Sequence, residues 1–230
     1  MRVVAGAMHD LPRRASWLKS CAEPRDIARL MPLPDATEFR TLIRAQPAEQ
    51  VVDDVLFANE AKHVSAEQLQ AVDVALRTAF GLDADDLLEL IVVGSSKLGY
   101  SVCEKRLRSG ELLPRYRKFS ANSDIDIVVV SQKLYFKFWR ELSAYSHAQR
   151  PFPWGSGALG DYHVVGWLRP DTFPAVNRPP LCVRWWEVFG GLGRRYFSDR
   201  KVRGGLYFMS SFAHEYHRRA VDSCRVAEGL

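Results

Sequence analysis

The stretch that decides the fold is Leu87–Ser96, which reads LLELIVVGSS. Its apolar part, residues 87–93, becomes β-branched toward the end, and this predicts a buried β-strand. The Gly-Ser-Ser that follows predicts a tight turn, because glycine tolerates backbone angles that other residues avoid. A second apolar run, DIDIVVV at 124–130, predicts another buried strand. We expect both strands in one mixed sheet.

Segments with helical periodicity alternate with these strands. Ser65 followed by Gln68 is a capping-box pattern that predicts a helix over 66–80. A basic helix is predicted over 97–108, and a short strand over 162–168. The other predicted elements are helices at 36–48, 48–61, 132–148, 183–196 and 211–226, and a strand at 203–209. This alternation predicts an α/β (α+β) fold, a small mixed sheet flanked by helices.

The length of 230 residues fits one or two domains. We expect an N-terminal helical extension over 1–82 that packs on a core domain over 83–230. Two segments are predicted to be mostly loop: residues 1–35, which contain Pro and Arg with weak periodicity, and the polar, basic residues 109–123.

The composition excludes several classes of protein. No apolar run approaches the roughly 18–20 residues of a membrane helix, so no membrane partner is expected. The N-terminal segment becomes charged too soon for a secretory signal. The four cysteines form no Cys-x-x-Cys pair, so neither a disulfide framework nor a zinc ribbon is expected. A reducing cytoplasm is the expected location.

Charge is distributed unevenly along the chain, whose net charge is +5. Residues 46–90 hold ten acidic and two basic residues, whereas residues 91–118 hold two acidic and seven basic ones. Residues 184–230 are basic as well, with nine basic and five acidic residues. Basic clusters attract polyanions such as nucleic acid or triphosphates. The alternative is that these charges only solvate the surface.

The turn after the first strand is a candidate phosphate site. Gly94 lets a ligand approach the backbone, and the free N–H groups at the start of a following helix suit a phosphate. The hydroxyls of Ser95 and Ser96 can add hydrogen bonds, and Lys97 follows directly. An ordinary turn with a helix N-cap is the alternative.

The start of the second strand is a candidate metal site. Asp124 and Asp126 are two residues apart, so on a strand their side chains project to the same face. Two neighbouring carboxylates repel each other, and a cation bound between them offsets the free-energy cost of that repulsion. Mg²⁺, or Mn²⁺ in its place, takes one or two carboxylates together with phosphate oxygens and water. A solvated strand start is the alternative.

Taken together, the two motifs resemble the DNA polymerase β-like nucleotidyltransferase superfamily at Gly94, Ser95, Asp124 and Asp126. The resemblance covers residues 87–130. It implies a nucleotidyltransferase-like fold that moves a nucleotidyl group from an NTP to a hydroxyl. It also implies that the triphosphate lies on the Gly-Ser turn and that the two aspartates hold Mg²⁺. Small bacterial members include toxins, antibiotic-modifying enzymes and makers of signalling nucleotides.

This chain departs from the family pattern in two places. The segment between Ser95 and Asp124 is longer than usual and more basic. Active members also carry a third catalytic carboxylate on a later strand, whereas the predicted strand GGLYFMSS at 204–211 holds no acid. Asp161 is the positional candidate for this catalytic role, and Glu187 is the second choice. If neither serves, a catalytically degenerate nucleotide- or RNA-binding module within a larger protein assembly is the alternative function.

The basic segment between the two motifs is a candidate contact with phosphate or nucleic acid. Arg115, Arg117 and Lys118 are expected to face the triphosphate or an acceptor backbone, with RNA or tRNA as the expected acceptor. Aromatic residues within it could stack on a base, namely Tyr100, Tyr116 and Phe119. A second basic face is expected near residues 194–203. The aromatic residues Trp185, Trp186, Phe189 and Tyr196 are expected in the core.

Overall fold

The computed structural model describes residues 32–58, 60–107, 109–148, 158–173 and 178–230. By its internal contacts Leu33–Leu230 forms one compact unit, which contains the sheet and the helices. Nearly all of the loop predicted over residues 1–35 lies outside the described residues.

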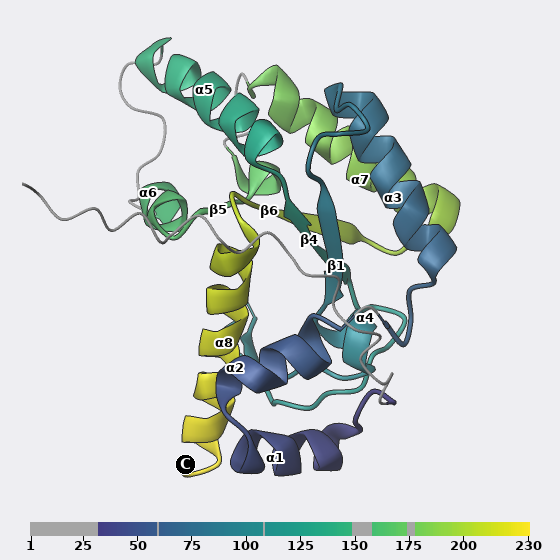
Figure 1. Ribbon diagram of the computed structural model, residues 1–230, viewed down its shortest axis with the longest axis vertical. Helices are drawn as coiled ribbons and strands as arrows, with labels where there is room; N and C mark the ends of the chain where they lie inside the picture. The colour runs from purple at the N-terminus through teal and green to yellow at the C-terminus, as the bar shows by residue number, and fades with distance from the viewer. Residues whose placement is uncertain (1–31, 59, 108, 149–157, 174–177) are drawn as a thin grey trace, which may run out of the picture. The chain divides into compact units, whose positions relative to one another are not determined.

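Within the described ranges, four strands form one mixed sheet in the order β1–β4–β6–β5 (Figure 1). The strands are β1 (Glu89–Val93), β4 (Ile125–Val130), β6 (Val202–Tyr207) and β5 (Trp167–Leu168). β4 pairs antiparallel with β1 and parallel with β6, and β5 pairs antiparallel with β6. The predicted mixed sheet is confirmed, and three of its predicted strands correspond to β1, β4 and β6.

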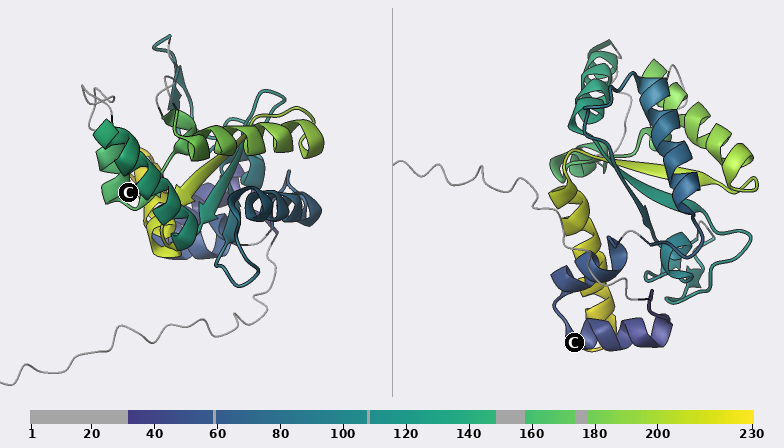
Figure 2. Two further views of the ribbon diagram at one scale, coloured as in Figure 1. Left: turned by 90° about the horizontal axis from the view of Figure 1, so that it is seen from above. Right: turned by 45° about the vertical axis from the view of Figure 1, so that its right-hand side comes forward.

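Both faces of the sheet are covered by helices (Figures 1 and 2). Successive strand residues point to opposite faces, so β4 contributes Ile127 and Val129 to one core and Val128 and Val130 to the other. The first core is shared with α3 (Ala66–Phe80), α5 (Gln132–Ala148) and α7 (Pro180–Tyr196). The second is shared with α1 (Ala36–Ala45), α2 (Ala48–Val51) and α8 (Ser210–Ala227). Each aliphatic side chain buried in this way contributes about 1.5–3 kcal/mol.

Local capping explains where two of the helices begin. The predicted capping box is present at α3, where the Ser65 hydroxyl accepts from Gln68 N–H at 3.3 Å and the Gln68 side chain accepts from Ser65 N–H at 2.9 Å. α3 ends at Gly81, whose φ of 58° closes the helix in the left-handed conformation. Asp35 and Glu38 form the same box at the start of α1.

The helix predicted over 48–61 is shorter in the structure. α2 continues only as a π-helical turn, Val52–Leu56. The chain then leaves the helix to bond with the segment after β1, since the N–H groups of Lys62 and His63 donate to the carbonyls of Lys97 and Ser96. These tertiary hydrogen bonds outweigh the local helical periodicity.

The basic helix predicted over 97–108 is wrong. Only α4 (Ser95–Leu98) is helical there, and Gly99, with φ of 86°, ends it. Beyond it, a short hairpin forms from β2 (Lys105–Arg106) and β3 (Leu112–Leu113), the latter inside the segment predicted to be loop.

The strand predicted over 162–168 is also largely wrong. Residues 162–164 belong to α6 (Ala158–Val164), and Gly166, with φ of 68°, turns the chain into β5. Trp167 and Leu168 then pair with Tyr207 and Leu206 of β6 before a 3₁₀ turn at Pro170–Thr172.

The helices before residue 82 and the sheet belong to the same compact unit, Leu33–Leu230. The boundary predicted between residues 82 and 83 stays a prediction. Among the described residues, none of the helices combines the length and the apolar character that crossing a bilayer requires.

Candidate functional site

The turn after β1 lies directly against the first carboxylate of β4. Val93 pairs with Asp126 across the antiparallel ladder, and Gly94 follows Val93. A Cβ atom added to Gly94 would lie 3.3 Å from Asp126 Oδ2. The two motifs that the sequence separates by 30 positions therefore adjoin at one end of the sheet.

Gly94 has a backbone conformation that other residues rarely adopt. Its φ is 68° and its ψ is −150°, a region populated almost only by glycine. This turn leads the chain into α4, and the Asp126 carboxylate closely approaches the position that a Cβ would take. The position therefore needs glycine for its backbone and for the close approach of the carboxylate.

The other residues of the turn are used in different ways. Ser95 is half-buried, whereas the buried Ser96 hydroxyl donates to Val93 O at 3.0 Å. Lys97 is 1% exposed, and its ammonium donates to the carbonyls of Ala58 and Glu60. Burial lowers the pKa of Lys97 to about 8. Lys97 therefore ties the turn to the segment after α2, and the phosphate contact expected of it stays a prediction.

The second carboxylate is held by an arginine from the neighbouring strand. Arg203 of β6 pairs in register with Asp126 and lies with its Nε 2.7 Å from Asp124 Oδ2. The Nε–H is not aligned on that oxygen and has no hydrogen-bond acceptor among the described residues. The contact is therefore an ion pair of opposite charges rather than a directed hydrogen bond.

Asp126 is the more strongly perturbed carboxyl. Burial raises its pKa, and the nearby charge of Asp124 raises it further. The positive charges of Arg203, Arg169 and Lys105 act in the opposite direction. A partly buried carboxyl whose ionised form is disfavoured is a place where a cation gains free energy.

Aromatic and basic side chains from β5 and α8 line the region beside these carboxylates. The Arg169 guanidinium lies 6.0 Å from the centre of the Trp167 ring and forms an ion pair of 2.7 Å with Asp171. The rings of Trp167 and Tyr216 are 4.9 Å apart. Sequence reasoning missed Arg169 and Tyr216, which no local motif marks, because they meet the site only through the pairing of β5 and the packing of α8.

The carboxylate pair fits one divalent cation that completes its shell with phosphate oxygens and water. The disfavoured charge of Asp126 supports that fit. The described part of the chain holds no group of three or more His, Cys, Asp or Glu side chains arranged for a metal ion.

The two candidates for a third carboxylate lie on helices. Asp161 is exposed on α6, and the expectation that it begins a strand is wrong because Gly166 delays the strand to residue 167. Glu187 is exposed on α7, which covers the face of the sheet opposite to Asp126. Neither is among the charges that perturb Asp126. A catalytic role for Asp161 stays a prediction.

The predicted phosphate contacts after the hairpin make local bonds. Arg115 donates to Val102 O at 3.2 Å and to Ser223 Oγ at 3.1 Å, which joins this loop to α8. Arg117 donates to Pro114 O, and Lys118 is exposed. Nucleic-acid contact by these three residues stays a prediction.

The aromatic residues of the same segment are partly structural. Tyr100 is 5% exposed, with its ring edge-on to Phe39 at 6.1 Å. Phe119 stacks on His63 at 4.2 Å, with the Arg200 guanidinium 4.7 Å from its ring centre. These rings order the loop around the turn.

We compared the chain with protein-family models, with curated proteins and with solved structures, and nothing matches it.

Proposed function

We propose that the chain is a Mg²⁺-dependent nucleotide-binding protein of the DNA polymerase β-like nucleotidyltransferase type. The observation that carries the proposal is the contact between the Gly94 turn and the Asp126 carboxyl, 3.3 Å from a Cβ at Gly94. The resemblance requires a strand that ends in a Gly-Ser turn, and next to it a strand that carries Asp-x-Asp.

Asp126 and Asp124 would hold the cation. Bound there, Mg²⁺ would neutralise the phosphate charge and polarise the phosphoryl group. The absence of a side chain at Gly94 would let phosphates approach the backbone of the turn, and the neighbouring Arg203 would offer a guanidinium to their oxygens.

A hydroxyl on RNA, such as the end of a tRNA, is the acceptor we propose. The positive charge of two segments supports this acceptor, because RNA is a polyanion. The net charge is +5 for residues 91–118 and +4 for residues 184–230. A toxin or a defence protein that inactivates RNA would use such a reaction, and a protein partner would restrain it.

A second function is favoured by one specific observation. The position on β6 that pairs with Asp126 holds Arg203 in place of a carboxylate. Active members of the family use a third carboxylate to activate the attacking hydroxyl. With an arginine in that position, the site would bind an NTP with its metal and transfer nothing, as a sensing module in a larger assembly.

The experiment measures binding and transfer separately. Binding of each NTP with Mg²⁺ or Mn²⁺ is followed by calorimetry, and transfer is followed with α-labelled NTPs, Mg²⁺ and total RNA. Asp126→Asn tests the site, and Asp85→Asn, which alters an exposed acid in the turn before β1, is the matched control.

Three outcomes distinguish the functions. Metal-dependent NTP binding with label on RNA, lost in Asp126→Asn, supports the transferase. Binding without label on RNA, protein or a small product supports the sensing module. Equal NTP binding by the wild type and Asp126→Asn contradicts both.

A further inference from the structure

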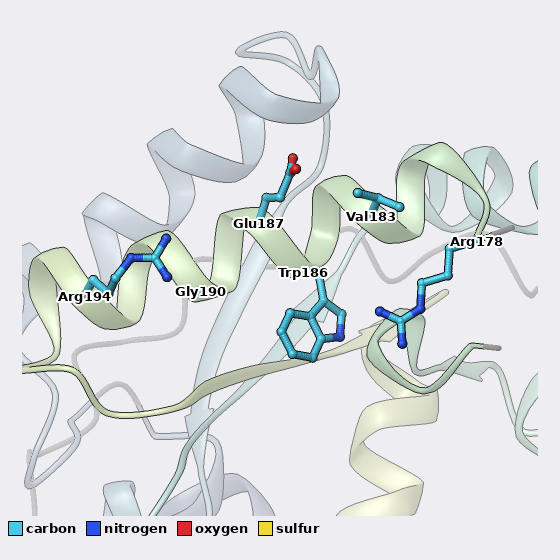
Figure 3. Close-up of a pocket in the computed structure, with 6 residues that line it drawn as sticks. All are labelled: Arg178, Val183, Trp186, Glu187, Gly190 and Arg194. Carbon is cyan, nitrogen blue, oxygen red and sulfur yellow. The ribbon is translucent and has the colours of Figure 1, made fainter. Parts of the chain in front are cut away.

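A pocket on the outer face of α7 lies away from the carboxylate site. It has a volume of about 320 Å³. Its lining residues are Arg178, Val183, Trp186, Glu187, Gly190 and Arg194 (Figure 3). Ligand pockets span about 300–1,000 Å³, so this one suits a single small group. α7 covers the face of the sheet opposite to Asp126, so the pocket is a separate site.

The pocket exists because α7 has two different sides. Trp185 and Phe189 are 1% and 4% exposed, so they belong to the core as predicted. Trp186 is 51% exposed, contrary to the prediction that it is buried. This half-exposed indole presents a flat apolar surface to solvent, and its Nε1–H donates to the carbonyl of Asp171 at 3.4 Å.

A glycine opens a notch beside this indole. Trp186, Gly190 and Arg194 are four residues apart, so they follow one another along one side of the helix. The Arg194 guanidinium extends back over Gly190, with one nitrogen 3.6 Å from where a Cβ would lie. Glycine inside a helix lowers the stability of the helix by about 1 kcal/mol relative to alanine. Apart from this guanidinium, no atom is found within 4 Å of the Cβ position at Gly190.

Positive charge is present at both ends of the notch. The Arg178 guanidinium lies 5.8 Å from the centre of the Trp186 ring, and Figure 3 shows it directed toward the indole. Arg194 lies beyond Gly190 on the other side (Figure 3). The Glu187 side chain projects from α7 on the side away from Trp186 (Figure 3).

We propose that this notch binds a nucleobase with its adjoining phosphates, and that its natural occupant is single-stranded RNA. The base would stack on Trp186 over the space at Gly190, while Arg194 and Arg178 would contact the flanking phosphates. Aromatic stacking combined with a basic track is the usual chemistry of single-strand binding. The proposal does not depend on the carboxylate site, although the same RNA could serve as its acceptor.

The chain offers a matched pair of variants. Gly190→Ala fills the notch, whereas Gly191→Ala adds the same methyl group one position around the helix, where nothing lies within 4 Å. Both should raise the melting temperature by roughly 2–4 °C through helix propensity. Only Gly190→Ala should weaken RNA binding, so a gain in stability would accompany a loss of affinity.

Binding is measured by fluorescence anisotropy of a labelled uniform-sequence RNA oligonucleotide. Trp186→Ala should weaken it by roughly 5- to 150-fold. Trp139→Ala, which removes a tryptophan of similar exposure (45%) on α5, should leave it unchanged. Arg194→Ala should reduce the slope of log K against log salt by about 0.7. Competition by the unlabelled single-stranded oligonucleotide, by adenosine monophosphate and by duplex RNA identifies the source of the base.

Competition by single-stranded RNA alone supports the proposal as stated. If adenosine monophosphate competes with the same affinity as the RNA, and Trp186→Ala weakens its binding too, RNA is overturned as the occupant. The site would then bind a nucleobase and its phosphate from a mononucleotide. Binding that Trp186→Ala and Gly190→Ala leave unchanged overturns the site. The assay contains neither NTP nor a divalent metal, so failure here is distinguishable from failure of the proposed nucleotide site.

Discussion

Arg203 and Asp124 form an ion pair across the parallel strands β6 and β4, with 2.7 Å between Nε and Oδ2. The pair is about a quarter to a third exposed at both side chains. A guanidinium in this position neutralises one of the two carboxylates that would otherwise bind a metal. Under the proposed function, Arg203 and a divalent cation would compete for the charge of Asp124.

Replacing Arg203 with Gln should expose this competition. Without the guanidinium, the two carboxylates repel each other, and we expect the free energy of unfolding to fall by about 1–2 kcal/mol in metal-free buffer. Mg²⁺ or Mn²⁺ should restore part of that loss, because the freed carboxylates bind the cation more tightly. Urea titration with and without the metal measures both effects.

The control removes an ion pair away from the site. Arg219→Gln breaks the exposed contact of 3.2 Å with Glu215 on α8. Its stability should change little, and the metal should not alter the change. Equal responses of the two variants to Mg²⁺ would show that Arg203 does not compete with a cation.

Asp126→Asn should stabilise the metal-free protein at neutral pH. Burial and the nearby Asp124 raise the pKa of Asp126 above its ordinary value of 3.8. Such a group supports folding below pH 3.8, and its contribution is lost as the pH rises through the folded pKa. The gain from Asn should be about 1.4 kcal/mol for each unit of pKa difference, and it should vanish in acid.

Thermal denaturation of both proteins between pH 4 and 8 in chelating buffer measures this difference. Saturating Mg²⁺ should stabilise the wild type and leave Asp126→Asn unaffected, which reverses the order of stability. A variant that is equally destabilised at every pH would mean that Asp126 is held by hydrogen bonds rather than disfavoured by burial.

Gly94→Ala should abolish NTP binding while the fold persists. The backbone at this position, with φ of 68° and ψ of −150°, costs a non-glycine residue about 1–3 kcal/mol. The added Cβ would also lie 3.3 Å from Asp126 Oδ2, in the space proposed for phosphate. Calorimetric titration with NTP and Mg²⁺ measures the loss.

Gly110→Ala provides the comparison for backbone strain. Gly110 has φ of 89° and nothing within 4 Å of its Cβ position, so the variant is strained without touching a carboxylate. It should lose stability and keep NTP binding. If Gly94→Ala binds NTP as well as Gly110→Ala does, the turn does not hold phosphate.

The elements that the sequence predicts best are those whose signals are local. α3 and α5 match the predicted helices over 66–80 and 132–148 at both ends, because apolar spacing and, for α3, a capping box act within the element. The segments at 97–108 and 162–168 were mispredicted because Gly99 and Gly166 take left-handed conformations that end one element and redirect the chain. Periodicity alone does not reveal such turns.

In the candidate site too, the sequence predicts the features that local motifs mark and misses those that depend on long-range pairing. The contact of Gly94 with Asp126 follows from two motifs at strand ends, so the resemblance led to it. The pairing of Arg203 with Asp124 depends on the register of β4 and β6, which are 77 residues apart at the paired positions Asp126 and Arg203. The burial of Lys97 depends on carbonyls from the segment after α2. Long-range register and packing have no signature in a single sequence.

Lys97→Met should change how stability depends on alkaline pH. Burial lowers the pKa of Lys97 from 10.5 to about 8, so the fold is weakened whenever this ammonium is charged. A group with a lowered folded pKa supports stability at high pH, and that support is lost as the pH falls through the folded pKa. The free energy of unfolding of the wild type should therefore rise, relative to the variant, by up to about 1.4 kcal/mol per unit between pH 8 and 10.

Urea denaturation at pH 7, 8, 9 and 9.5 measures this difference, and Lys133→Met is the control. The hydrogen bond from Lys133 to Asp86, and then that to Asp83, raises the pKa of Lys133 above its ordinary value of 10.5. Its support is fully present below pH 10.5 and is lost only as the pH rises through the raised pKa, so the difference between the wild type and Lys133→Met should stay constant from pH 7 to 9.5. Parallel curves for the wild type and Lys97→Met across this range would mean that water reaches the ammonium of Lys97. The contact between the turn and the segment after α2 would then be looser than its hydrogen bonds to the carbonyls of Ala58 and Glu60 indicate.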